Sequence, residues 1–268
     1  MSLVRVRASS LSELFDCPAR WEARNLRGLA MPSSGAAQLG TAVHIGTAAF
    51  DADRMKGLPP AEALDHAESA LVNAIRNPRR DVQWGELTAD LAETIGLALL
   101  RRYAAEVSPK YRFAAVEAAC PALDMPELGI SLTGTTDRVY IDPDSGRLGV
   151  ADIKTGKNAV SADGSVSTAG HALQLAAYEL LAGRILGKDI SAPAHVIGLS
   201  VAKSAGARRT GVGIVRGARE LLSSSGSQPG FLQHASAMIT SGRFYGNPRS
   251  MLCRENSCPA FDKCRWRK

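Results

Sequence analysis

Two apolar segments separated by a strong turn signal constrain the fold of this chain more than any other feature. Residues 130–141 and 148–153 are typical of strands, and the intervening Asp142-Pro-Asp-Ser-Gly146 is rich in residues that form tight turns. The sequence therefore predicts a β-hairpin. If its turn is centred on Asp144-Ser145, the register of the two strands follows directly.

This register would place two carboxylates opposite each other. Asp137 would face Asp152, and Thr135 would face Lys154. Because side chains alternate along a strand, all four would share one face, with opposed Cβ atoms about 4.5–5.5 Å apart. Opposed like charges destabilise a hairpin, and a divalent cation such as Mg²⁺ or Mn²⁺ would neutralise them, since both bind carboxylate oxygens. The alternative is a surface hairpin whose charges are solvated.

The remaining pattern predicts an α/β fold with a mainly helical N-terminal part. Helices are expected at 11–26, 36–56, 60–76, 87–106, 169–186 and 228–241, and further strands at 111–123, 195–202 and 212–215. Ser10 and Glu13 would form a capping box at the first helix. The Ser/Gly/Asp-rich segment 157–168 is expected to be a mobile loop.

Charge and hydropathy favour a cytoplasmic protein with a polyanionic partner. The formal net charge is +6, and Lys and Arg side chains near phosphates release condensed counterions. No run of about 18 apolar residues occurs, which excludes a membrane-spanning helix. Residues 1–10 lack an apolar stretch, so we do not expect a signal peptide.

An ordered set of short motifs covers almost the whole chain. They are Leu11-Ser-Glu-Leu-Phe-Asp-Cys-Pro18, Gly40-Thr-Ala-Val-His44, Gly134-Thr-Thr-Asp-Arg138, Asp152-Ile-Lys-Thr-Gly156, Gln174-Leu-Ala-Ala-Tyr178 and three C-terminal cysteines. In this order they resemble the RecB-like exonuclease family of the PD-(D/E)XK nuclease superfamily, especially its CRISPR-associated and phage members with an iron–sulfur cluster. The resemblance implies a restriction-endonuclease-like core, in which helices flank a mixed central sheet.

The resemblance also implies a set of site residues. The expected ligands of Mg²⁺ or Mn²⁺ are His44, Asp137, Asp152 and the backbone carbonyl of Ile153. Lys154 would be the catalytic lysine, and Gln174 and Tyr178, which share a helix face, would line the site. The second acidic position is often Glu in these nucleases and is Asp152 here. Glu117, on the preceding strand, is a further candidate carboxylate.

Four of the five cysteines are candidate ligands of a second metal centre. An odd number of cysteines argues against a disulfide framework, and Cys253, Cys258 and Cys264 have ligand-like spacing, with Cys17 as the fourth thiolate. Four thiolates suit a 4Fe–4S cluster or a structural Zn²⁺, and spacing alone does not separate the two. The resemblance favours the cluster, although the family's common tail has a shorter first gap. Cys120 lies outside this set and is expected to be buried in a strand.

These features lead to one preferred function and two alternatives. The preferred hypothesis is a single nuclease domain, with a helical part (1–108), a core (109–245) and a cluster segment (246–268). It would hydrolyse phosphodiester bonds of single-stranded DNA or DNA ends, in recombination, repair or CRISPR adaptation, with the cluster closing a ring around the strand. The alternatives are a structure-specific endonuclease and a non-catalytic DNA-binding subunit. The expected partner is DNA, and a homo-oligomer or partner proteins of recombination or CRISPR systems are further candidates.

Overall fold

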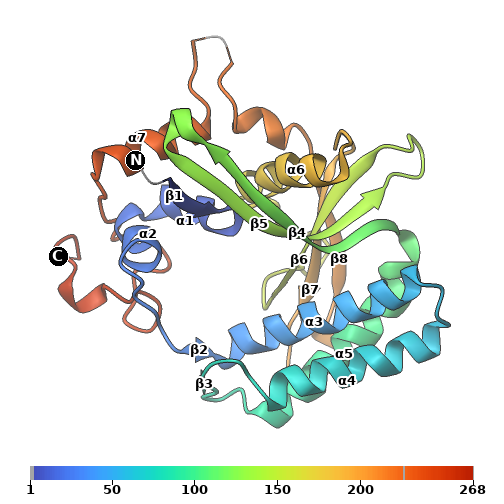
Figure 1. Ribbon diagram of the computed structural model, residues 1–268. Coiled ribbons are helices and arrows are strands. Elements are labelled where there is room, and N and C mark those ends of the chain that lie inside the picture. The colour runs from blue at the N-terminus through green and yellow to red at the C-terminus, as the bar shows by residue number, and fades with distance from the viewer. Residues whose placement is uncertain (1–2, 226, 268) are drawn as a thin grey trace.

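The computed structural model describes residues 3–225 and 227–267 and contains a mixed sheet flanked by helices (Figure 1). Its strands are β1 (Val4–Arg7), β4 (Arg112–Met125), β5 (Ile130–Ile141), β6 (Leu148–Gly156), β7 (Ala194–Ser200) and β8 (Thr210–Val215). They lie in the order β1-β5-β6-β7-β8, and β4 pairs with β5. The expected mixed α/β core is confirmed. Four residues lie outside the described ones: Met1, Ser2, Gly226 and Lys268. The first two and the last are the ends of the expected parts 1–108 and 246–268.

Helices cover both faces of the sheet (Figure 1). They are α1 (Leu11–Asp16), α2 (Pro18–Asn25), α3 (Gly35–Met55), α4 (Pro60–Arg76), α5 (Ala89–Glu106), α6 (Ala172–Leu186) and α7 (Phe231–Ser241). Alternation along β6 divides the core: Val150 packs in the cluster that includes α6, whereas Ala151 and Ile153 pack with α3, α4 and α5. Within the described residues, no helix combines the length and apolar character needed to cross a bilayer.

The segment 11–26 forms two helices rather than the single helix expected. The break falls at Cys17, whose φ and ψ are −143° and 87°. Pro18 explains it, because proline disfavours helical geometry in the preceding residue. The expected capping box is also wrong: the Ser10 hydroxyl donates to Arg7 O instead, and the Glu13 carboxylate pairs with arginines of α2.

Three strands in the first hundred residues were not expected from the helical pattern. β1 pairs in parallel with β5, while β2 (Ser33–Ser34) and β3 (Val82–Gln83) form a small separate sheet. The segment 157–168, expected as a mobile loop, packs onto β7 and β8. Val160 is 2% exposed, and a Cβ at Gly198 would lie only 2.9 Å from it. This segment therefore covers one face of β7 and β8.

One strand changes its neighbour halfway along, and this change positions the candidate site. β5 pairs with β1 as far as Thr133, and with β6 only from Arg138 onward. Residues 134–136, between these two ladders, pair with β4 on the other side. The sheet therefore opens between β1 and β6, next to Gly134-Thr-Thr-Asp137.

Candidate active site

Asp137 and Asp152 lie where β5 and β6 separate. The predicted register is confirmed over 138–141 and 148–151, and the ladder ends there, one position before the two aspartates. The Asp137 carboxylate reaches into the gap, where its Oδ2 accepts a hydrogen bond from the Ile153 N–H at 2.9 Å. A side chain therefore takes the amide that a continued ladder would have used.

The predicted opposition of Thr135 and Lys154 is wrong. Thr135 pairs with Ala119 of β4, and Lys154 lies beside Gly198 of β7. The divergence of β5 and β6 explains why Thr135 and Lys154 do not face each other, because β6 continues along β7 after it leaves β5.

Helix α3 brings a histidine to this opening. His44 Nδ1 lies 3.3 Å from Asp137 Oδ2, and ligand atoms of His44, Glu117 and Asp137 all lie within 4.8 Å of one another. The close approach of α3 depends on Gly40, where a Cβ would lie 2.8 Å from Thr155 Oγ1. One imidazole nitrogen and two carboxylates form a donor set that suits Mn²⁺ or Mg²⁺.

Glu117 enters this group through an unusual backbone conformation. Among the described residues it is the one non-glycine residue with positive φ, at 47°. Its neighbours pair with Arg138 and Thr136, so Glu117 lies across from Asp137 between β4 and β5. Burial and the Asp137 charge raise the pKa of Glu117. Such a strained residue costs about 1–3 kcal/mol and is typical of functional sites.

A second group of side chains from β6 and α6 adjoins the first. Lys154 Nζ lies 2.7 Å from Asp152 Oδ2 and donates to Gln174 Oε1 at 3.0 Å. Gln174 Nε2 in turn donates to Asp152 Oδ1 at 3.1 Å and to the Tyr178 hydroxyl at 2.8 Å. The ring of Tyr178 fits against Gly134, where a Cβ would lie 3.0 Å from it. One glutamine thus fixes the lysine, the carboxylate and the tyrosine together.

The electrostatics of Asp152 fit a cation. Its side chain is 2% exposed, and burial together with repulsion from Asp137 raises the pKa to about 6, although Lys154 and His44 lower it. A divalent ion would relieve this repulsion, because it neutralises neighbouring carboxylates. Asp152 thus adjoins the group formed by His44, Glu117 and Asp137. The charges of Asp137 and His44 both shift its pKa, so the two groups interact electrostatically.

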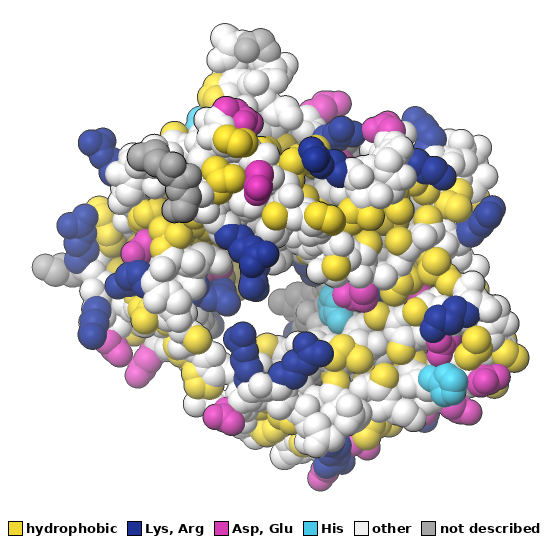
Figure 2. Space-filling view, in the orientation of Figure 1, with side chains coloured by type: hydrophobic (Ala, Val, Ile, Leu, Met, Phe, Trp, Pro, Cys, Tyr) yellow, Lys and Arg dark blue, Asp and Glu magenta, His cyan; other side chains and the backbone are white. Residues whose placement is uncertain are grey.

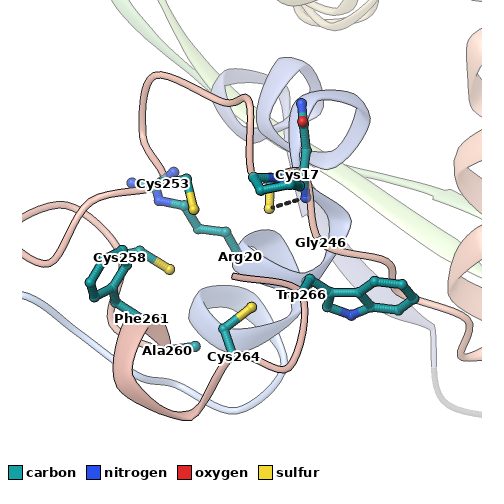
Figure 3. Close-up of a pocket in the computed structure, with 12 residues that line it drawn as sticks. Cys17, Arg20, Gly246, Cys253, Cys258, Ala260, Phe261, Cys264 and Trp266 are labelled. Carbon is teal, nitrogen blue, oxygen red and sulfur yellow. Dashed lines mark hydrogen bonds between the residues drawn. The ribbon is translucent and has the colours of Figure 1, made fainter. Parts of the chain in front are cut away.

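The four predicted cysteine ligands line one pocket (Figure 3). Cys17 comes from the break between α1 and α2, and Cys253, Cys258 and Cys264 come from the C-terminal segment; Figure 3 shows their sulfur atoms directed into the same space. The thiols are free, and burial raises the pKa of Cys258. Cys120 lies apart on β4 and is only partly buried, donating to Ala118 O at 3.4 Å.

Hydrogen bonds also join the two ends of the chain at this pocket. Asn247 N donates to Cys17 Sγ at 3.4 Å, and Arg20 Nε donates to Ser257 O at 3.1 Å. The Trp266 side chain covers Gly246, where a Cβ would lie 2.7 Å from it.

The site residues that sequence reasoning missed lie elsewhere: Asp51 of α3 and its partner Arg138 are both fully buried.

Carboxylates, a lysine and a histidine lie together at the opening between two central strands, an arrangement that could hold a divalent ion. Residues 5–265 match the family described as the PD-(D/E)XK nuclease superfamily. The chain therefore belongs to that superfamily, whose members use divalent metals and for which DNA is the expected substrate. A search of curated proteins found no match.

Proposed function

We propose that this chain is a Mg²⁺- or Mn²⁺-dependent DNA exonuclease of the RecB-like, iron–sulfur type, acting on single-stranded DNA or DNA ends. One observation carries the proposal: His44, Glu117 and Asp137 converge within 4.8 Å, beside the buried Asp152 and its partner Lys154. These side chains provide a group that can bind a divalent ion, and the positively charged ammonium of Lys154 lies next to it. We assign the activity to recombination, repair or CRISPR adaptation.

Each side chain has a defined role in the proposed hydrolysis. His44, Asp137, Asp152 and the Ile153 carbonyl, with Glu117 in addition, would hold the ion. When bound, the metal supplies an activated water and neutralises charge on the phosphate. Lys154 would donate to a phosphate oxygen or to the attacking water, stabilising the charge that develops there.

Gln174 and Tyr178 would act through the lysine. The Gln174 carboxamide accepts from Lys154 and donates to both Asp152 and Tyr178, so its orientation is fixed on both sides. A lysine held in this way reaches the reacting phosphate with little reorganisation. Gln174 and Tyr178 therefore keep the Lys154 ammonium group beside the Asp152 carboxylate.

The shape of the molecule supports a single strand as substrate. Figure 2 shows the molecule hollowed at its centre, with Lys and Arg side chains along the rim and histidine and acidic side chains on one wall. In Figure 1, α2 and the C-terminal segment lie across this space from α3 and the strands of the site. Positive charge around an opening suits the phosphate backbone of a single strand.

We propose that the four cysteines, which line one pocket, hold a 4Fe–4S cluster, as the family resemblance favours, with a structural zinc as the alternative. A 4Fe–4S cluster is larger than one ion, and it would join Cys17 to the C-terminal segment. Its binding free energy would then help to close the ring.

One cleavage experiment tests the proposed activity. Anaerobically purified protein is incubated with Mn²⁺ and end-labelled linear single strands, linear duplexes or closed single-stranded circles. We expect cleavage of linear single strands and intact circles. Cleavage of circles would favour a structure-specific endonuclease, whereas binding without any metal-dependent cleavage would overturn the enzyme and favour a non-catalytic DNA-binding subunit.

A further inference from the structure

A fully buried ion pair joins the helix that carries His44 to the strand that carries Asp137. Arg138 Nε lies 2.7 Å from Asp51 Oδ2, and both side chains are 0% exposed. Asp51 lies seven residues after His44 on α3, which places the two on one helix face. Arg138 directly follows Asp137 on β5. The ion pair therefore spans the two elements that hold the proposed metal ligands.

Asp51 also accepts hydrogen bonds from α5 and from the segment that follows α5. The Tyr103 hydroxyl of α5 donates to Asp51 Oδ2 at 2.5 Å, and the Ser108 hydroxyl donates to Oδ1 at 2.6 Å. Both carboxylate oxygens are thus engaged, and the charge is compensated by Arg138. The position of α3 relative to β5 is fixed by hydrogen bonds that have directional requirements.

Arg138 carries this constraint into the metal group. Its Nη1 donates to the backbone carbonyl of Asp137 at 2.7 Å and lies 3.7 Å from Glu117 Oε1. The same guanidinium therefore donates to the backbone of Asp137 and attracts the carboxylate of Glu117. Its Nε pairs with Asp51 on α3, the helix that also carries His44. Apolar residues often replace a buried ion pair without loss of stability. A geometric role would account for the use of charge here.

We propose that Asp51 and Arg138 are positioning residues for the metal group, setting the separation between His44 on α3 and the carboxylates on β4 and β5. This inference rests on the proposed function, because it requires that the group binds a divalent ion. Neither residue would be a ligand of the ion, because Arg138 is a cation and both Asp51 carboxylate oxygens already accept hydrogen bonds. Partners that orient metal ligands typically contribute 10–100-fold to metal affinity.

Mn²⁺ affinity, measured by loss of the free-ion EPR signal, tests the proposal without relying on turnover. We expect Asp51→Asn and Arg138→Lys to raise the Mn²⁺ Kd about tenfold or more. Tyr103→Phe removes one hydrogen bond to Asp51 and keeps the ring, so it should raise the Kd by less. Arg101→Lys is the matched control, because Arg101 pairs with Glu68 at 2.6 Å on the surface of α5. It should leave the Kd unchanged.

Thermal unfolding with and without Mn²⁺ separates positioning from a merely structural role. A positioning role predicts that Mn²⁺ raises the Tm of wild type by more than that of each variant. Equal Mn²⁺ shifts and an unchanged Kd in folded variants would overturn the inference. If Asp51→Asn and Arg138→Lys do not fold, an unchanged Kd in Tyr103→Phe would overturn it. Wild type that binds no Mn²⁺ would overturn the proposed function as well.

Discussion

Gly40 of α3 and Thr155 of β6 are in such close contact that a Cβ at position 40 would lie 2.8 Å from Thr155 Oγ1. His44 follows Gly40 by one helical turn and so projects from the same face. The absence of a side chain at Gly40 thus allows α3 to approach β6, and this approach brings His44 to 3.3 Å from Asp137.

Gly40→Ala should therefore separate the helix from the strand. We expect it to destabilise the protein by about 1–3 kcal/mol, the usual cost of overpacking a tight contact. The free energy of unfolding in urea measures this. Thr155→Ala removes the atom that the new methyl group meets, so the double variant should recover most of the loss. Full stability of Gly40→Ala, or no recovery in the double variant, would show that this contact does not limit the approach of α3.

The hairpin and its register could be predicted because local signals determine them. Asp142-Pro-Asp-Ser-Gly146 specifies the turn, and strand alternation specifies the register. The separation of β5 from β6 could not be predicted, because it depends on β1, which is far away in sequence, and on a hydrogen bond that the Ile153 N–H donates to the Asp137 side chain. Candidate ligands were recognisable from motifs, but their convergence with Glu117 required the fold.

The Asp51–Arg138 pair was missed for a related reason. Asp51 lies outside the Gly40–His44 motif of its Ala-rich helix, and a lone aspartate in a helix is usually exposed. Its seven-residue spacing from His44 is the one local signal that could have indicated a shared face. Its burial depends on Tyr103 and Ser108, which only the tertiary structure places beside it.

Gln174→Leu should release Lys154 and Asp152 from their common partner. We expect kcat on linear single-stranded DNA at saturating Mn²⁺ to fall about 10–100-fold, since Gln174 orients the lysine without replacing it. Tyr178→Phe removes one acceptor of Gln174 and keeps the ring packed against Gly134, so its effect should be much smaller. Steady-state kinetics of both variants give kcat and KM separately. Equal losses in the two variants would contradict the role assigned to Gln174.

Metal binding should depend on pH through Asp152. Its pKa is raised to about 6, and a protonated carboxyl binds Mn²⁺ poorly, so the Mn²⁺ Kd should fall as pH rises from 5 to 7. Asp152→Asn should bind more weakly and lose most of this dependence. Titrations at several pH values measure both. A Kd for wild type that is constant over this range would contradict the assignment of Asp152 as a ligand.

The metal-free protein should become less stable as pH rises, whereas its binding of Mn²⁺ should strengthen. A carboxyl whose pKa rises from 3.8 to about 6 on folding retains a proton that the unfolded chain has released. Stability is therefore lost as pH rises between these two values. Added Mn²⁺ should offset the loss, so the difference in Tm with and without Mn²⁺ should grow between pH 5 and pH 7. A difference that shrinks with rising pH would refute this linkage.

Cys258→Ser should abolish the proposed cluster, because a serine hydroxyl is a poor iron ligand. We expect iron and sulfide to fall to trace amounts in anaerobically purified protein, with a loss of visible absorbance and a lower Tm. Cys120→Ser is the matched control, since Cys120 lies on β4 outside the pocket, and it should keep its iron. Zinc in place of iron in the wild-type protein would contradict the cluster.

Hydrolysis of linear single-stranded DNA by wild type and Lys154→Ala tests the central claim most directly. Lys154 Nζ lies 2.7 Å from Asp152 Oδ2, whereas Lys157 is exposed three residues later and serves as the matched control. With Mn²⁺ present, wild type and Lys157→Ala should release labelled nucleotides at similar rates, and Lys154→Ala should be slower by about 100-fold or more. Equal rates for wild type and Lys154→Ala, or no Mn²⁺-dependent release by wild type, would contradict the account.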